Sequence, residues 1–223
     1  MPYRQNIFAS GYVYHVFNRG VARMPIFFDR RDKIRALQTI QYYRFDKPPI
    51  KFSHYLQLSR EQRQRILSEL HSKHQKIVDI IFYVFMENHW HFIVKQNLEN
   101  GISKFMSQVS DSFTKYVNTK QERVGPLFQG PFGAVGIETD NQLVHVSRYL
   151  HLNPLIGGLT DKNHFRQYEW SSLKDYERGD SDWCTIDPIL SHFKSPEDYL
   201  KFVLDQESYA RELKQIQHLL IEK

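Results

Sequence analysis

The sequence has almost no cysteine and no long run of apolar residues. Cys184 is the only cysteine among 223 residues, which rules out an intrachain disulfide and a zinc site built from cysteines. No stretch of ~18 apolar residues occurs, so no membrane-spanning helix is expected, and the N-terminal residues lack the apolar core of a secretory signal. We therefore expect a protein of a reducing, cytoplasmic compartment.

The composition is otherwise that of a folded protein with a slight basic excess. Hydrophobic residues make up 41% of the chain and aromatic residues 14%, enough to form a core and to exclude wholesale disorder. The 30 Lys and Arg residues outnumber the 25 Asp and Glu residues. This excess permits nucleic-acid binding but does not require it, because proteins with other partners share it.

Hydrophobic periodicity predicts an α+β chain. The strands are expected at 11–20, 76–86 and 90–95, with a short one in the glycine-rich stretch 124–140, and the helices at 29–45, 59–76, 101–120, 139–153 and within 195–220. Ser59 with Gln62 and Thr139 with Gln142 have capping-box spacing, and Pro154 is expected to end its helix at about Asn153.

This order of elements is typical of a ferredoxin-like antiparallel sheet with helices on one face. We place a boundary after Leu159. Residues 1–159 would then form one domain with a helical insertion at about 44–75, and residues 160–223 a C-terminal loop and helical extension.

The stretch ENHWHFIVK sets two histidines one residue apart on a predicted strand. Strand side chains alternate, so His89 and His91 share one face and Trp90 points to the other, where it would be core. Two neutral imidazoles on one face are good ligands for a divalent metal. The pattern alone leaves two readings open, a shared metal or phosphate site, or one core and one surface histidine.

The later stretch LVHVSRYLHLNP sets three polar side chains four residues apart on a predicted helix. His145, Tyr149 and Asn153 therefore lie in one row, a phenol between an imidazole and a carboxamide. Taken alone, the row also fits an amphipathic helix in which Asn153 caps the end before Pro154. A functional reading needs the histidine pair as well.

Several motifs in a fixed order resemble a known family. NHWHFIV, FTKYVN, GPLFQGPFGAVGIETDNQLVHVSRYLHLNPL and YEWSSLKDY look like the single-tyrosine HUH transposases (IS200-like), and most like the REP-associated tyrosine transposase branch. The opening stretch YHVFNRGVARMPIFFD is similar to the same branch. The resemblance spans about 12–176, apart from the insertion. It departs from the family at Pro131, where a basic residue usually follows Gln-Gly.

The resemblance implies a metal-dependent endonuclease and strand transferase that cleaves single-stranded, hairpin-containing DNA through a covalent 5′-phosphotyrosine. It makes Tyr149 the nucleophile, and His89, His91 and Asn153 the ligands of Mg²⁺ or Mn²⁺. His145, one helical turn before Tyr149, is a candidate proton acceptor from its position alone. The family also implies a bacterial, nucleoid-associated protein, acting as a monomer or a homodimer.

The expected partner is single-stranded DNA with a palindromic hairpin. Single-strand binders combine basic grooves with stacking aromatic rings. The candidates of these types are Arg19, Arg23, Lys95, Lys104, Lys115, Arg123, Phe128 and Phe132.

Two alternatives remain open at this stage. One is a non-catalytic protein that keeps the fold and binds DNA hairpins. The other is a zinc hydrolase in which His15 or His145 joins His89 and His91 as a third imidazole ligand.

Overall fold

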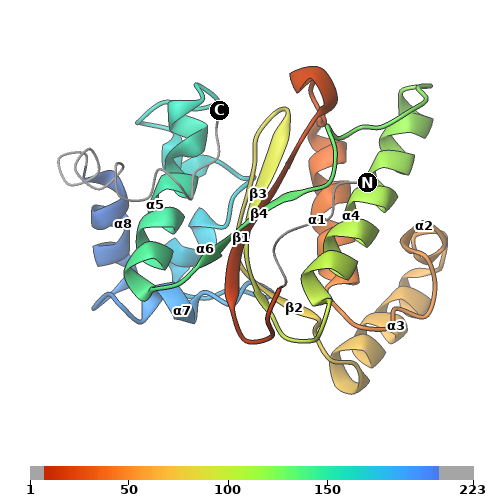
Figure 1. The fold of residues 1–223 in the computed structure, drawn as a ribbon, viewed down its shortest axis with the longest axis horizontal. Helices are drawn as coiled ribbons and strands as arrows, with labels where there is room; N and C mark the ends of the chain where they lie inside the picture. The colour runs from red at the N-terminus through yellow and green to blue at the C-terminus, as the bar shows by residue number, and fades with distance from the viewer. Residues whose placement is uncertain (1–7, 206–223) are drawn as a thin grey trace.

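Four strands form one antiparallel sheet in the computed structural model, which describes residues 8–205 (Figure 1). The strands are β1 (Val13–Arg19), β2 (Val78–Phe85), β3 (His89–Gln96) and β4 (Gly133–Ile137), in the order β2-β3-β1-β4. Strand β3 pairs with β2 and β1, and β1 also pairs with β4. The predicted β2–β3 hairpin is therefore confirmed.

One face of the sheet is covered by helices α1 (Arg30–Tyr43) and α4 (Gly101–Lys120), which pack along each other. The alternation of β3 sends Trp90 and Phe92 toward this layer. Trp90 is fully buried, with its ring centroid 5.4 Å from that of Phe113, and Phe92 lies 6.4 Å from Phe105. The prediction that Trp90 is a core residue is confirmed.

The opposite face is covered by the helices that follow β4. These are α5 (Asp140–Ile156), α6 (Leu173–Arg178), α7 (Asp187–Leu190) and α8 (Pro196–Leu204). Figure 1 shows them on the left of the sheet, with α1 and α4 on the right. The α+β class and the antiparallel sheet are confirmed. Helices cover both faces rather than one because the α5 side of the sheet also carries apolar residues, such as Phe82, that must be buried.

Helix α5 begins as predicted and ends later than predicted. Thr139 caps its start in a capping box with Gln142, but Pro154 lies inside the helix, which runs to Ile156. The expected stop at Asn153 is wrong. Proline removes its own N–H bond and crowds the preceding turn, but the helix continues here, and the N–H of Gly157 donates to the carbonyl of Asn153 at 2.7 Å. Asn153 is thus an interior helical residue and not a cap.

The insertion forms two helices beside α1 and α4. They are α2 (Phe52–Tyr55) and α3 (Arg60–Lys73), the latter with the predicted capping box of Ser59 and Gln62. The ring of Phe52 packs 5.2 Å from that of Tyr42 on α1. Two 3-10 helices complete the fold, η1 (Val21–Arg23) and η2 (Phe165–Gln167).

The segment after α5 hydrogen-bonds to the outer edge of β2. Ser172 N–H donates to Tyr83 O at 3.0 Å, Phe85 N–H to Trp170 O at 2.8 Å, and Thr185 N–H to Ile80 O at 2.8 Å. These contacts cover an edge that would otherwise expose unpaired backbone groups. The boundary after Leu159 stays a prediction. The helix expected within 195–220 is confirmed at α8, and the rest of that range lies outside the described residues.

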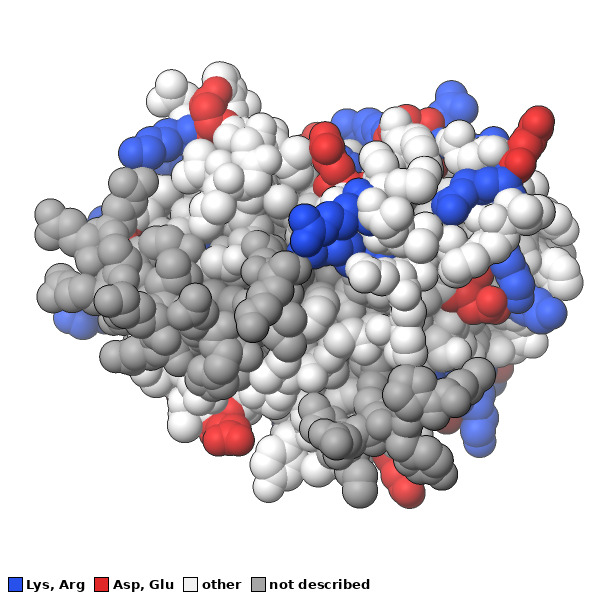
Figure 2. Space-filling view, turned by 45° about the horizontal axis from the view of Figure 1, so that its top comes forward, with Lys and Arg blue, Asp and Glu red and all other residues white. Residues whose placement is uncertain are grey.

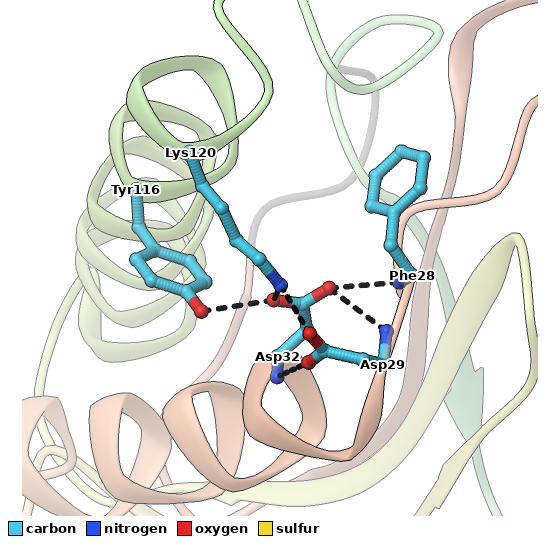
Figure 3. A network of polar contacts seen from close by, with 5 residues as sticks. All are labelled: Phe28, Asp29, Asp32, Tyr116 and Lys120. Atoms are coloured by element: carbon cyan, nitrogen blue, oxygen red, sulfur yellow. Dashed lines mark hydrogen bonds and ion pairs between the residues drawn. The ribbon is translucent and has the colours of Figure 1, made fainter.

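A buried carboxylate joins α1 to α4 (Figure 3). Asp32 has no exposed surface and accepts hydrogen bonds from Lys120 Nζ at 2.6 Å, Tyr116 OH at 2.9 Å and the Phe28 N–H at 2.8 Å. Asp29 caps the helix and also binds Lys120, at 2.8 Å. The start of α1 and the end of α4 are therefore held together by a network in which two carboxylates share the Lys120 ammonium.

Over residues 8–205, no helix has both the length and the apolar character needed to cross a membrane.

Candidate active site

The two histidines of the HWH stretch lie side by side on the α5 face of the sheet. Their ring centroids are 4.9 Å apart and the rings are nearly perpendicular, at 86°. His89 is the first residue of β3, opposite Arg19, and His91 is opposite Phe17. The shared face was predicted from the strand period and follows directly from it.

Each histidine uses its Nδ1 atom in a hydrogen bond. His89 Nδ1 lies 2.6 Å from Asn88 Oδ1, and Asn88 Nδ2 donates to Arg23 O at 2.9 Å, which orients the amide. An amide oxygen only accepts, so His89 Nδ1 carries the proton and the lone pair of the neutral ring is on Nε2. His91 Nδ1 lies 2.9 Å from His15 Nε2. When His91 is the donor, its lone pair is also on Nε2, the arrangement typical of metal-binding histidines.

The histidines open onto a cavity of about 290 Å³ at the end of β1 and β3. Its described lining consists of Phe17, Asn18, Arg19, His89, His91, Gln129, Gly130, Pro131 and Gly133. The stretch 129–133 closes one side because Gly133 has no side chain: a Cβ there would lie 2.3 Å from the Phe17 ring. The residues that line the cavity thus include two imidazoles, one guanidinium and two carboxamides.

Gln129 is a site residue that the sequence reasoning missed. Its N–H donates to Arg19 O at 2.8 Å, which ties the glycine-rich loop to the end of β1. The only signal was its place beside Gly130, and a lone glutamine in a loop carries little information. Arg19, by contrast, was predicted as a DNA contact, and the structure brings it into the same cavity as the histidine pair.

Tyr149 and Asn153 come from the helix that covers this same face. Phe82 on β2 packs against His151 of α5 at 4.5 Å, and a Cβ at Gly157 would lie 2.7 Å from Met86 Cε. The N–H of Met86 donates to His89 O at 2.9 Å, so the last turn of α5 lies beside the β2–β3 turn.

Both side chains are buried, with exposures of 7% for Tyr149 and 3% for Asn153. Neither is among the described residues that line the cavity. The helix that bears Tyr149 and Asn153 therefore covers the histidine face, but neither side chain belongs to the described cavity lining.

His145 points toward the outer helical layer. Its ring centroid is 5.3 Å from that of Phe202 on α8, and the guanidinium carbon of Arg148 lies 4.6 Å from the same ring. His145 is not part of the described cavity lining. Its position in the sequence row with Tyr149 therefore does not bring it to the histidine pair.

A buried network fixes α5 against the C-terminal segment. His151 Nδ1 lies 2.7 Å from Tyr199 OH and its Nε2 lies 3.2 Å from Ser172 Oγ, and Ser147 Oγ lies 3.1 Å from the same phenol. Burial lowers the pKa of His151 to about 3, so its ring is neutral at physiological pH. Sequence reasoning had no signal for this role, because the partners of His151 lie 21 and 48 residues away.

The remaining predicted DNA contacts lie on different elements of the fold. Figure 2 shows Lys and Arg side chains scattered among acidic ones over the face in view. Arg23 is exposed in η1 and Lys95 is exposed on β3. Lys104 donates to Asp46 O, Lys115 pairs with Asp111 at 2.7 Å, and Arg123 donates to Pro126 O at 3.3 Å.

The two predicted aromatic contacts differ in position. Phe128 is 6% exposed and its ring centroid is 4.8 Å from that of Trp90, a position for packing the core rather than for stacking on a base. Phe132 is half-buried and stacks with Phe8, with centroids 6.1 Å apart.

The matches among solved structures include two of low identity. One is a structure of the REP-associated tyrosine transposase bound to a REP hairpin, with 15% identity and a TM-score of 0.48, over 82% of this chain and 92% of that chain. The other is tRNA(His) guanylyltransferase from Saccharomyces cerevisiae, with 10% identity and a TM-score of 0.34, over 98% of this chain and 82% of that chain. No curated protein matches the sequence.

The family comparison is more specific. The model described as "Transposase IS200 like" matches residues 55–153, the segment that contains His89, His91, Tyr149 and Asn153. This match agrees with the resemblance seen in the sequence motifs and with the antiparallel α+β fold. The matched segment, which is less than half of the chain, is similar to the IS200-like transposase family.

Proposed function

We propose that this protein is a metal-dependent endonuclease and strand transferase for single-stranded, hairpin-containing DNA, with Tyr149 as its nucleophile. The main observation in support is the pair His89 and His91, which share one face of the sheet and use their Nδ1 atoms in hydrogen bonds. With Arg19, the pair lines one cavity. The helix that bears Tyr149 covers that same face. A bacterial cytoplasm, at the nucleoid, is the setting that this function requires.

The residues present fit a divalent cation. Two imidazole Nε2 atoms would supply nitrogen ligands, and the Asn153 carboxamide oxygen would supply a third, with water and phosphate oxygens completing a site for Mn²⁺ or Mg²⁺. When bound, such an ion would neutralise charge that develops on the scissile phosphate. His15 would act as a positioning residue, because its hydrogen bond to His91 Nδ1 sets the orientation of that ring.

The chain's own residues carry the bond exchange. Arg19, in the cavity wall, would pair with a phosphate oxygen of the strand. The Tyr149 oxygen would attack phosphorus and lose its proton, and the bond from phosphorus to the 3′ oxygen would break as that oxygen takes up a proton. One phosphodiester replaces another at each transfer, so a 3′ hydroxyl can reverse the step without ATP.

The covalent-adduct assay tests this proposal. Purified protein is incubated with Mn²⁺ and fluorescent single-stranded hairpin oligonucleotides, and the protein-bound label is quantified on a denaturing gel. We expect an adduct for the wild type and a loss of at least ~1,000-fold for Tyr149→Phe. Tyr12→Phe is the matched control, because Tyr12 is 63% exposed and remote from the proposed chemistry. Adduct formation by Tyr149→Phe would overturn the assignment of the nucleophile.

The two alternatives predict different outcomes. A non-catalytic hairpin-binding protein would shift hairpins on a native gel and form no adduct with any divalent cation. For a zinc hydrolase, no group of three or more His, Cys, Asp or Glu side chains within residues 8–205 is arranged to hold a metal. His15 Nε2 points at His91 Nδ1 instead of standing beside the pair as a third ligand.

A further inference from the structure

A second groove of the described molecule lies away from the histidine cavity. It measures about 710 Å³, within the ~300–1,000 Å³ typical of ligand sites. Its walls are α1, α4 and the start of the insertion, in the layer that covers the Trp90 face of the sheet. Figure 1 shows α2 and α3 beside this helix pair, so the insertion supplies one wall of the groove.

The charged residues of the groove wall are mainly cationic. Arg35, Lys51, Lys115 and Lys120 line it, and Asp111 is the one acid among its described lining residues. Lys120 is held by Asp29 and Asp32. Lys115 pairs with Asp111, but the two side chains are 72% and 63% exposed, so this pair costs little to open. The positive charge matches an anionic ligand.

Two side chains of the groove wall, Arg35 and Gln108, carry buried polar atoms, and Arg35 also packs against aromatic rings. The guanidinium carbon of Arg35 lies 4.5 Å from the Phe52 ring centroid and 5.2 Å from that of Tyr116, so the charge is held between two rings. Arg35 Nε and Gln108 Oε1 are buried, and within the described residues neither has a hydrogen-bond partner. Buried polar atoms ordinarily have partners, and both side chains line the groove, so they retain hydrogen-bonding capacity that a polar ligand would satisfy.

We propose that this groove binds a short single-stranded segment of nucleic acid. Phosphates would contact Lys51 and Lys115, and a base would lie against Tyr116 with its polar edge toward Arg35 and Gln108. Cationic side chains beside an aromatic ring on which a base can stack, here Tyr116, are typical of single-strand binding sites. The inference rests on the proposed function, since the bound segment is the DNA on which the histidine face acts. It makes the insertion a DNA-binding element.

Salt-dependent binding tests the groove without any cleavage. The full chain is titrated into a fluorescent oligothymidine of about 15 nucleotides in EDTA, and anisotropy is measured at several salt concentrations. The double variant Lys51→Gln/Lys115→Gln removes two phosphate contacts. We expect its salt slope to be smaller by about 1.4, since each contact to a single strand contributes ~0.7, and its affinity to fall about 10-fold.

The matched control is Lys162→Gln/Lys174→Gln, which removes the same charge from two exposed lysines outside the groove. Equal losses in the two double variants would overturn the proposal, because the effect would then be one of net charge. Photocrosslinking supplies a second, independent measurement. An oligonucleotide with 5-iodouracil is expected to crosslink to peptides within 48–53 or 108–120, and crosslinks confined to the stretch 129–133 would also overturn it.

The outcomes separate this inference from the proposed function. A hairpin whose single-stranded tail ends a few nucleotides beyond the cleavage site should form its Tyr149 adduct equally well in the groove variant and the wild type, because so short a tail leaves the groove empty. If the wild type forms no adduct while the groove variant still loses oligothymidine binding, the proposed function fails and the groove stands. If adduct formation is normal and the groove variant binds oligothymidine like its control, the groove fails and the proposed function stands.

Discussion

The two faces of the central sheet use the same strand for different purposes. On β3, Trp90 and Phe92 enter the layer of α1 and α4 and are fully buried among aromatic rings. Between them, His91 enters the α5 side, where His15 and His89 accompany it. The apolar face supplies burial that stabilises the sheet, and the other face can therefore carry polar groups.

Buried polar clusters occur on both faces of the sheet, and they differ in whether a cavity adjoins them. The Asp32 network is closed, because the Lys120 ammonium, the Tyr116 phenol and backbone N–H groups surround the carboxylate (Figure 3). The histidine cluster is open on one side to a cavity with Arg19 in its wall. A closed cluster holds helices together, whereas an open one can accept a ligand. The variants described below test this contrast.

The largest effect on stability is expected from Trp90→Ala. Loss of a fully buried indole should lower the free energy of unfolding by about 3–5 kcal/mol, measured by urea denaturation. Its neighbour His89 faces the other way and is only half-buried. His89→Ala should cost less than about 1 kcal/mol of stability but slow adduct formation more than about 100-fold. The contrast fails if both variants lose stability alike.

Asp32→Ala should lower the free energy of unfolding by about 3 kcal/mol. The substitution leaves Lys120 and buried N–H groups without their main acceptor, since Asp32 has no exposed surface. Asp111→Ala is the control, because its pair with Lys115 is exposed and should be worth less than about 1 kcal/mol. Equal losses in the two variants would show that the buried network is not the stabilising element.

His15→Phe should weaken metal binding about 10- to 100-fold, because His91 loses the partner of its Nδ1 atom. Calorimetric titration with Mn²⁺ measures the affinity. His15→Gln keeps a hydrogen-bonding side chain at this place and should recover most of the affinity. A purely packing role for His15 would instead give Phe and Gln variants with unchanged affinity.

The stability of the α5 layer should depend on pH through His151. Its pKa is about 3 in the folded chain against 6.5 for an ordinary imidazole. As pH falls below 6.5 the unfolded chain takes up a proton that the folded chain refuses, so the free energy of unfolding decreases down to about pH 3. The contribution is at most about 1.4 kcal/mol per pH unit.

Urea denaturation between pH 7 and pH 4 measures this dependence. His151→Gln does not titrate, so its free energy of unfolding should fall less steeply with decreasing pH than that of the wild type. His54→Gln, an exposed position on α2, should keep the wild-type slope. Parallel curves for His151→Gln and the wild type would contradict the assignment.

The smallest effect is expected from His145→Gln. Because His145 packs against Phe202 of α8, adduct formation should stay within about threefold of the wild type. A loss of more than tenfold, with an altered pH profile of the rate, would restore His145 as the proton acceptor that its sequence position suggests.

Patterns within single elements were predicted well. The strand period placed His89 and His91 together, and capping-box spacing located the starts of α3 and α5. Such signals depend on neighbours a few residues away. The expected stop at Pro154 failed, since the helix continues past the proline to Ile156. The second helical layer was also missed, since nothing local distinguishes helices on one face from helices on both.

Contacts across elements could not be read from the sequence. His15 and His91 are 76 residues apart and meet because β1 and β3 are paired in one register. Gln129 joins the cavity because its loop closes over the end of β1. Phe128, expected to stack on DNA, is instead buried against Trp90.

The sequence by itself determined the α+β class and the shared face of the histidine pair, because both depend on order and spacing along the chain. The tertiary structure alone decided that His15 supports His91, that α5 lies over the histidine face and that the insertion forms a groove with α4. The physical reason is that strand register, helix docking and burial set distances between residues far apart in sequence, and local pattern carries no information about those distances.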